Sequence, residues 1–360
     1  MNGGNVYTMR KKRTDHTLFT DSHHYTATLC RYDFSVNNGR YVLTSEAGLM
    51  LTVGQERYPH VNIDTGSGTC AVTFTTNCEY IVSGDDEGIQ VWRVKDGKRI
   101  AKKEVENVTC LAVSKDGRWI AAGTWRGHVS VWDAETYEQA FTLDKDVFGI
   151  NGADFSPDST RLVTASSNST ATIWDVTLRK HVQTLRHVNL VTAAKYSPQG
   201  DRIATVTEDS IRVWNSDSGR LLVDIPVTVT PLYDTSLLWF NNLNHLFVIS
   251  ASKIKRFDAS TGLVVSQWPA PDTKRISCIA LPRHGKFIAY STNRTVTFWD
   301  TSTYTQLALI QHSQDILSIA LSPDDRFIAI GGIRGKITIE SLSRVTVSTE
   351  IRSVTYVVLV

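Results

Sequence analysis

The chain has 360 residues, of which 41% are hydrophobic and 21% are charged. This is the composition of a folded globular protein, and it excludes the disordered and fibrous classes. The 38 basic and 36 acidic residues leave a formal net charge of +2, so no overall field attracts nucleic acid or an anionic membrane. A charged partner would have to be recognised by local patches.

The N-terminus carries a basic cluster at residues 10–13, but no apolar segment follows that would make a signal peptide, and no run approaches a membrane span in length. We expect residues 1–25 to form a flexible basic leader. We also expect a cytoplasmic or nuclear protein that is not secreted and has no membrane partner. The five cysteines have no metal-binding or redox spacing, so buried free thiols and no metal site are expected.

Residues 26–62 predict strands, since NNGRYVLTS reads as a turn leading into an apolar strand and LMLTV as a second strand. From residue 63 onward the same pattern recurs. Alternating apolar runs end at seven marker positions that are spaced 40 to 43 residues apart: Trp92, Trp132, Trp174, Trp214, Phe257, Trp299 and Glu340.

A second feature precedes each of these runs, namely a turn that feeds an apolar strand, as in SKDGRWIAA, SPDSTRLVT and SPDDRFIAI. Pro, Asp and Gly at these positions reverse the chain between two strands. A weaker strand such as AFTLDK or VQTLRH follows the marker. Four antiparallel strands at this interval are typical of a β-propeller blade.

The repeats resemble those of the WD40 family, since Trp-Asp itself stands at 132–133, 174–175 and 299–300. The resemblance implies an all-β propeller of four-stranded antiparallel blades over residues 26–351, with seven clear repeats in 63–351. Both features also occur 39 residues earlier, with Tyr41 before Tyr80 and Val53 before Trp92. Residues 26–62 are therefore predicted as a divergent eighth blade, the alternative being seven blades and a leader. Residues 352–360 would close the ring or begin a truncated blade.

The family's structural network is a carboxylate, a His, a hydroxyl and a Trp, and it maps best onto the fourth repeat. There the resemblance assigns Asp209, His187, Thr205 and Trp214 to a chain of buried hydrogen bonds. The other repeats lack one or more members of this network, so their packing is expected to rely more on apolar contacts. Their marker tryptophans are assigned to the structural network as well: Trp92, Trp132, Trp174 and Trp299.

Loops between strands two and three, and between strand four and the next repeat, emerge on one face of such a propeller. Aromatic and Arg side chains in these loops are the types enriched at binding hot spots. The predicted contact residues are Trp125, Arg126, Phe148, Tyr233, Arg275, Arg294 and Arg334.

No catalytic motif occurs in the chain, and no cofactor or small-molecule substrate is expected. The sequence predicts a non-enzymatic platform for protein partners, and its repeats resemble the expanded WD-repeat proteins of mushroom-forming fungi. Two alternatives stay open. Residues 257–268 resemble a segment of propeller quinoprotein dehydrogenases, and a nucleic-acid binder would need a basic stripe, which the loosely grouped Arg residues do not make.

Overall fold

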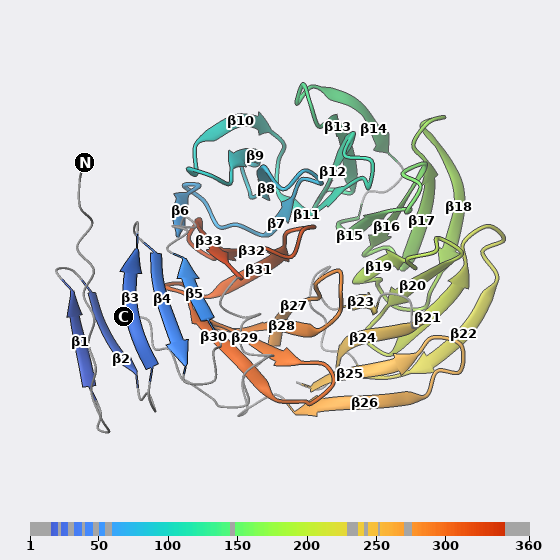
Figure 1. The fold of residues 1–360 in the computed structure, drawn as a ribbon. Helices are drawn as coiled ribbons and strands as arrows, with labels where there is room; N and C mark the ends of the chain where they lie inside the picture. Colours follow the sequence, from blue (N-terminus) through green and yellow to red (C-terminus); the bar gives the residue numbers. More distant parts are fainter. Residues whose placement is uncertain are drawn as a thin grey trace. The chain divides into compact units, whose positions relative to one another are not determined.

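The structure is a computed structural model that describes residues 60–144, 148–228, 237–240, 244–250, 253–269 and 276–342, together with the backbone of five strands between His16 and Gly54. The chain divides into two compact units, one of residues 59–347 and one of residues 1–58 with 348–360. The larger unit contains seven four-stranded antiparallel sheets arranged as blades in a ring (Figure 1).

The blades follow one another in chain order. Blade 1 contains β7 (Ala71–Phe74), β8 (Tyr80–Gly84), β9 (Gly88–Arg93) and β10 (Arg99–Glu104). Blade 2 contains β11 (Val108–Val113), β12 (Trp119–Thr124), β13 (His128–Asp133) and β14 (Gln139–Asp144). Blade 3 contains β15 (Ile150–Phe155), β16 (Arg161–Ser166), β17 (Thr170–Asp175) and β18 (Lys180–Arg186).

The next three blades repeat this order. Blade 4 contains β19 (Ala193–Tyr196), β20 (Arg202–Val206), β21 (Ser210–Asn215) and β22 (Leu221–Pro226). Blade 5 contains β23 (Leu237–Phe240), β24 (His245–Ser250), β25 (Lys253–Asp258) and β26 (Val264–Pro269). Blade 6 contains β27 (Ile276–Ala280), β28 (Phe287–Thr292), β29 (Thr295–Asp300) and β30 (Gln306–Gln311).

Blade 7 closes the ring with a strand taken from before the first repeat. Its three consecutive strands are β31 (Ile316–Leu321), β32 (Phe327–Gly332) and β33 (Lys336–Ser341), and its fourth strand is β6 (Val61–Asp64). The innermost strands β31 and β7 lie in contact, as do those of the other neighbouring blades. Because β6 takes the fourth position, closure of the ring does not need residues 352–360.

The seven-bladed propeller predicted from the repeats is confirmed, but the structure does not show an eighth blade. Residues 26–62 contain β3 (Tyr32–Asn37), β4 (Arg40–Ser45) and β5 (Met50–Gly54), which form a three-stranded antiparallel sheet in the smaller unit. The predicted boundary between the eighth blade and the first repeat, at residues 62 and 63, falls inside β6. In the structure β6 belongs to neither of these and pairs with β33. In the predicted leader, β1 (His16–Thr20) pairs with β2 (His23–Ala27).

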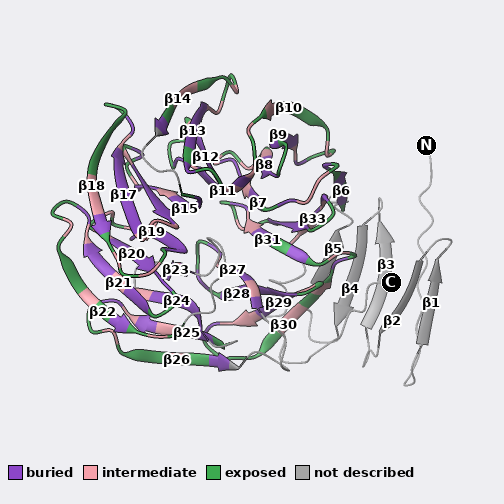
Figure 2. Ribbon diagram, turned by 180° about the vertical axis from the view of Figure 1, so that it is seen from behind, coloured by how far each residue is buried: buried purple, intermediate pink, exposed green. Residues whose placement is uncertain are grey.

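The core of the propeller lies between the blades. Strands two and three of a blade are buried along nearly their whole length because a neighbouring sheet covers each face, whereas outer strands such as β18, β22 and β26 are largely exposed (Figure 2). One apolar cluster joins Val131 and Leu143 of blade 2 to Trp174 of blade 3. Face-to-face packing of sheets therefore holds the ring together.

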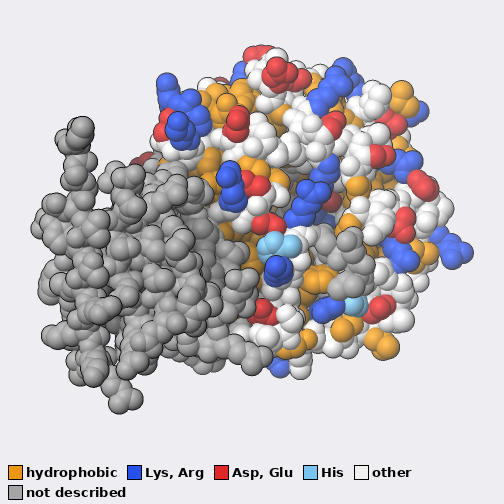
Figure 3. Space-filling model, in the orientation of Figure 1, with side chains coloured by type: hydrophobic (Ala, Val, Ile, Leu, Met, Phe, Trp, Pro, Cys, Tyr) orange, Lys and Arg blue, Asp and Glu red, His pale blue; other side chains and the backbone are white. Residues whose placement is uncertain are grey.

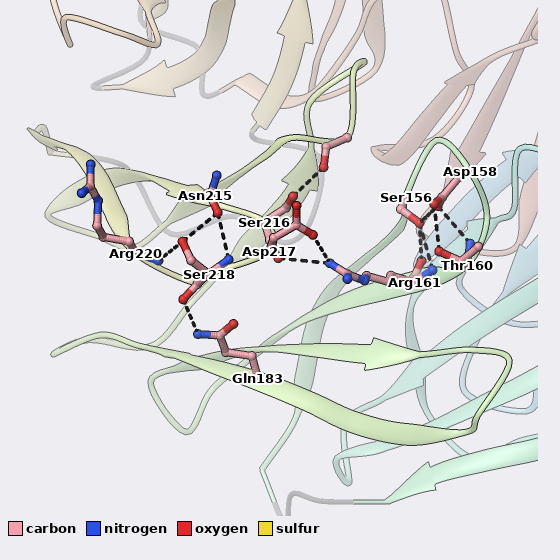
Figure 4. Close-up of polar contacts among 11 residues, drawn as sticks. Ser156, Asp158, Thr160, Arg161, Gln183, Asn215, Ser216, Asp217, Ser218 and Arg220 are labelled. Atoms are coloured by element: carbon pink, nitrogen blue, oxygen red, sulfur yellow. Dashed lines mark hydrogen bonds and ion pairs between the residues drawn. The ribbon is translucent and has the colours of Figure 1, made fainter.

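Polar contacts at the ends of the strands also join neighbouring blades. Arg161 of blade 3 donates from Nη1 to the Asp217 carboxylate over 2.8 Å, and Gln183 Nε2 donates to the Ser218 carbonyl over 2.9 Å (Figure 4). Arg202, one repeat later, donates to Asn244 Oδ1 over 3.0 Å in blade 5. Arg202 also donates to Ser260 Oγ over 3.2 Å, so in blades 4 and 5 the turn between strands three and four is tied to the blade before it.

Two further expectations concern membrane-spanning segments and the burial of the cysteines. Among the described residues, no helix is long and apolar enough to cross a membrane. Cys110 and Cys278 are buried as predicted, but Cys70 is exposed and Cys78 is half-buried, so the expectation of buried thiols was wrong for Cys70. The side chain of Cys30 lies outside the described residues.

Candidate interaction face

The loops between strands two and three of each blade, and the loops between successive blades, lie at the same end of the strands. We call this end the loop face. Backbone hydrogen bonds connect its loops, since Trp125 N donates to Asn107 O over 3.0 Å and Ser167 N donates to Gly149 O over 2.9 Å. The same pairing recurs in blade 7, where Ile333 N donates to Asp315 O over 2.9 Å. The loop face is therefore a linked surface on a rigid ring.

Close backbone approach contributes to this linkage. A Cβ at Gly149 would lie 3.0 Å from the Trp125 carbonyl oxygen, and a Cβ at Gly68 would lie 2.5 Å from the Ile333 carbonyl oxygen. Glycine is used where two backbones meet this closely. The two glycines thus hold neighbouring loops in contact.

The two aromatic residues predicted on this face are exposed there. Trp125 is 58% exposed in the loop between β12 and β13, and Phe148 is 54% exposed in the loop between β14 and β15. Neither fills a gap in the core between blades. Large apolar side chains exposed in neighbouring loops are typical of a protein-binding surface.

The predicted arginines on the loop face lie in ion pairs or at its rim. Arg126 Nη1 lies 2.7 Å from the Glu106 carboxylate, and Arg294 Nε lies 3.0 Å from Asp315 Oδ1. Their side chains are 65% and 59% exposed, so these pairs add little to the stability of the fold. Arg334 is exposed in the loop between β32 and β33.

Tyr233 and Arg275 lie outside the described residues, so their predicted contact role stays a prediction. Sequence reasoning passed over three aliphatic residues of the same loops. Val188 is 82% exposed, Leu190 is 39% exposed and Ile333 is 50% exposed. The signal was present in the sequence, since Val188-Asn189-Leu190 places two aliphatic residues in a connection where polar residues predominate.

The network predicted in blade 4 is only partly formed. Trp214 Nε1 donates to Thr205 Oγ1 over 2.8 Å, and the His187 ring lies edge-on to the Trp214 ring with centroids 5.3 Å apart. However, Asp209 accepts from Thr207 Oγ1 over 2.6 Å, and neither ring nitrogen of His187 has a hydrogen-bond partner. The structure therefore does not form the predicted hydrogen bonds through His187, and the Asp209 carboxylate bonds the Thr207 hydroxyl instead.

Burial has a direct consequence for the His187 imidazole. Desolvation, and the positive charge of Arg212, lower the pKa of His187 to about 4, although the Asp209 charge acts in the opposite direction. The imidazole is neutral near pH 7. His187 therefore acts as a packing residue against Trp214.

The other marker tryptophans show why the network varies. An indole N–H meets a hydroxyl on the preceding strand in two further blades, at 2.9 Å for Trp92 with Ser83 and at 3.0 Å for Trp174 with Thr164. The buried Trp132 Nε1 has no partner, because Ala122 occupies the register position of Ser83. Trp299, in β29, packs against the core cluster of blades 5 and 6.

The described residues contain no group of three or more His, Cys, Asp or Glu side chains placed to hold a metal ion. A recess of about 440 Å³ lies at the opposite end of blades 1 and 2, lined by turn residues that include Glu79, Tyr80, Asp116 and Tyr137. On the face that Figure 3 shows, Lys and Arg side chains are interspersed with Asp and Glu, and no continuous basic stripe crosses it.

Comparison with known families agrees with this architecture. The family described as nucleolar protein 10-like, N-terminal domain, matches residues 67–242. The family described as WD domain, G-beta repeat, matches residues 303–339. Both matches fall on blades of the ring.

Several curated proteins are similar to the chain. Small ribosomal subunit protein RACK1y of Oryza sativa subsp. japonica is 25% identical over 180 residues, which are 47% of this chain and 49% of the relative. Protein groucho of Drosophila melanogaster is 22% identical over 298 residues, 76% of this chain and 39% of the relative. U3 small nucleolar RNA-associated protein 15 homolog of Xenopus laevis is 24% identical over 241 residues, 64% of this chain and 45% of the relative. The chain spans less than half the length of each.

The ring of seven four-stranded antiparallel sheets defines a seven-bladed β-propeller. The repeated markers and the family matches then specify which propeller it is. The chain belongs to the WD40-repeat β-propeller family.

Proposed function

We propose that this protein is a non-enzymatic adaptor that binds protein partners through its loop face. The observation that carries the proposal is the exposure of Trp125 and Phe148 on neighbouring loops, whose backbones meet where Gly149 approaches the Trp125 carbonyl. A rigid surface with exposed aromatic anchors loses little conformational entropy on binding. The arginines Arg126, Arg294 and Arg334 would add polar contacts around these anchors.

The finer features of the proposal rest on the sequence. The sequences of the repeats are similar to those of the expanded WD-repeat proteins of mushroom-forming fungi, which supports membership of that group. The strand–turn–strand order of residues 26–62 supports a divergent blade. A cytoplasmic or nuclear location is supported by the printed names of the relatives, of which one is ribosomal and one nucleolar. No cofactor, metal or membrane partner is invoked.

The test is affinity capture from the native cell extract with the intact chain and with a triple variant, Trp125→Ala, Arg294→Ala and Arg334→Ala. The matched control is Leu178→Ala with Leu263→Ala, because these side chains are 61% and 68% exposed in turns at the opposite end of the strands. Circular dichroism and thermal unfolding verify that all three proteins are folded.

We expect the intact chain and the control to capture the same proteins and the triple variant to lose them. Equal capture by all three proteins would place binding elsewhere and overturn the assignment of the loop face. Turnover of a substrate by the purified chain, or binding to nucleic acid that weakens steeply with salt, would overturn the proposal of a protein-binding adaptor.

A further inference from the structure

Four exposed apolar side chains form one arc across blades 2 to 4 of the loop face. Trp125, Phe148, Val188 and Leu190 are 58%, 54%, 82% and 39% exposed. They come from three loops, between β12 and β13, β14 and β15, and β18 and β19. We call this set the apolar arc.

A fourth loop, residues 167–169, links the loops that carry the two halves of the arc. Ser167 N donates to Gly149 O over 2.9 Å on the Phe148 side. On the other side His187 N donates to Ser169 O over 2.9 Å, and Val191 N donates to Ser166 O over 3.1 Å. The loops that carry Phe148, Val188 and Leu190 are therefore joined by hydrogen bonds, and the Trp125 loop meets them by close backbone approach at Gly149.

Carboxylates flank both ends of the arc. Next to Trp125, the exposed Glu106 is paired with Arg126, and Asp86 accepts a backbone bond from Asn107 through its carbonyl while its side chain is exposed. Next to Val188 and Leu190, the hydrogen bond from the Thr207 hydroxyl, with a smaller contribution from the Asn189 side chain, lowers the pKa of Asp209, which is therefore ionised near neutral pH.

Glu208, beside Asp209, is also exposed, and among the described residues no basic side chain forms an ion pair with either one. At the first end the exposed Glu106 and Asp86 outnumber Arg126, and at the second end the exposed Glu208 and Asp209 outnumber Arg186, which lies two residues before Val188. Each end thus carries one more negative than positive charge. The far side of the loop face differs, because the exposed Arg334 and the half-buried Lys336 lie in blade 7. This charge pattern sets the chemistry of the partner that fits the arc.

We propose that the apolar arc binds a short linear segment of a partner protein that presents two or three apolar side chains flanked by Lys or Arg. The proposal rests on the proposed function of the loop face and specifies the class of partner. Apolar anchors would cover Trp125, Phe148 and Val188, and the flanking basic residues would meet Asp86 at one end and Glu208 at the other. An acidic segment would be repelled at both ends.

The test begins with a phage-displayed library of random peptides of about twelve residues, panned on the purified chain. Selected peptides are synthesised, and their affinities are measured by fluorescence polarisation. The arc variant is Trp125→Ser with Val188→Ser, and the charge variant is Asp86→Asn with Glu208→Gln. The matched control is Ile333→Ser with Lys336→Gln, which changes one exposed aliphatic and one half-buried charged residue on the far side of the same face.

We expect enrichment of apolar peptides flanked by Lys or Arg. The arc variant should bind them at least about tenfold more weakly, the charge variant about three- to tenfold more weakly with less salt dependence, and the control equally well. Affinity lost only in the control variant would overturn the proposal and leave the loop face as the binding surface.

If panning enriches no peptide while affinity capture still depends on Trp125, the partner is recognised as a folded surface. The linear-segment proposal then fails and the proposed function stands. Enrichment of acidic peptides would overturn the charge argument. If neither panning nor capture depends on any loop-face residue, both proposals fail.

Discussion

At the residue scale, a Trp at the marker position is paired with a hydroxyl side chain on the preceding strand in blades 1, 3 and 4. Trp214 finds the Thr205 hydroxyl, whereas in blade 5 both partners are apolar, with Phe257 at the marker and Val248 at the hydroxyl position. An indole N–H buried without an acceptor loses the hydrogen bond it had with water. Trp132, with Ala122 at the hydroxyl position, is an exception that retains the donor and lacks the acceptor.

This exception predicts a stabilising substitution. Ala122→Ser places a hydroxyl at the position that Ser83 and Thr205 occupy in other blades, within reach of Trp132 Nε1. We expect the free energy of unfolding to rise by about 1 kcal/mol, measured by denaturant unfolding followed by tryptophan fluorescence.

The matched control is Ala121→Ser. Ala121 is equally buried and adjacent, but it lies on the other face of β12, in the cluster shared with blade 3. The new hydroxyl there has no indole to meet and should destabilise the fold. Destabilisation by both substitutions would show that Trp132 does not need an acceptor.

His187 predicts a pH dependence of stability. Its pKa is about 4 in the folded protein and 6.5 in the unfolded chain, so the unfolded chain binds the proton first as the pH falls. Stability is fully present above pH 6.5 and is lost between pH 6.5 and 4, by at most about 3 kcal/mol from this residue.

The variant His187→Phe keeps a ring against Trp214 and removes the titration. Urea unfolding at a series of pH values should give parallel stability for the two proteins above pH 7 and a smaller loss for the variant below pH 6. Equal slopes in both proteins would mean that His187 is protonated in the folded state, contrary to its burial.

At the element scale, the decisive contact is between β6 and β33. The side chains of Val61 and Ile63 point into the core, being 7% and 4% exposed, and His60 Nδ1 lies 2.5 Å from the Glu340 carboxylate. Glu340 stands at the marker position of blade 7. In place of the usual Trp, Glu340 contacts His60, which directly precedes the strand that closes the ring.

The turn between β9 and β10 packs onto this closing strand and gives a prediction. Gly97 has a φ of +68°, and a Cβ on it would lie 2.6 Å from Val61 Cγ1 and 3.2 Å from Ile63 Cγ1. Gly97→Ala should therefore destabilise the propeller by about 2 to 4 kcal/mol, from backbone strain and from displacement of β6.

Gly66→Ala is the matched control, because Gly66 also has a positive φ, +88°, but open space around its Cβ. Only strain applies there, about 1 kcal/mol. Thermal unfolding and limited proteolysis near residue 60 measure both. Equal effects of the two substitutions would show that β6 does not depend on the turn.

At the scale of the whole propeller, each blade is stable only between two neighbours, because its inner strands are buried on both faces. Closure of the ring by β6 leaves blade 7 covered like the others. The loops at one end of the strands inherit this rigidity, which makes the loop face suited to binding.

This predicts that ring closure and binding are coupled. Ile63→Asp, which places a charge at a buried position of β6, should open blade 7 and lower the free energy of unfolding by several kcal/mol. Hydrogen exchange should then rise in β33 and in the loop at 333–335. Asn62→Ser, at an exposed position of the same strand, should change exchange little; uniform exchange in both variants would contradict closure by β6.

The sequence by itself determined the repeats, the strand order within each blade and the class of fold. Alternating apolar residues, turn chemistry and the marker Trp are local signals, so positions such as Trp92, Trp174 and Trp214 identified their strands directly. The sequence also placed Trp125 and Phe148 in loops, because the spacing of the predicted strands shows where the loops between them fall. Exposed loop residues need no tertiary contact to be placed on a face.

Only the tertiary structure decided how the ring closes and which polar links form. The pairing of β6 with β33 joins segments at the two ends of the propeller, and its four residues carry no marker that a repeat search detects. Likewise, whether Asp209 reaches His187 or Thr207 depends on side-chain distances within one turn, which spacing does not set. Local patterns determine elements, whereas contacts between distant segments emerge only when all the blades are packed.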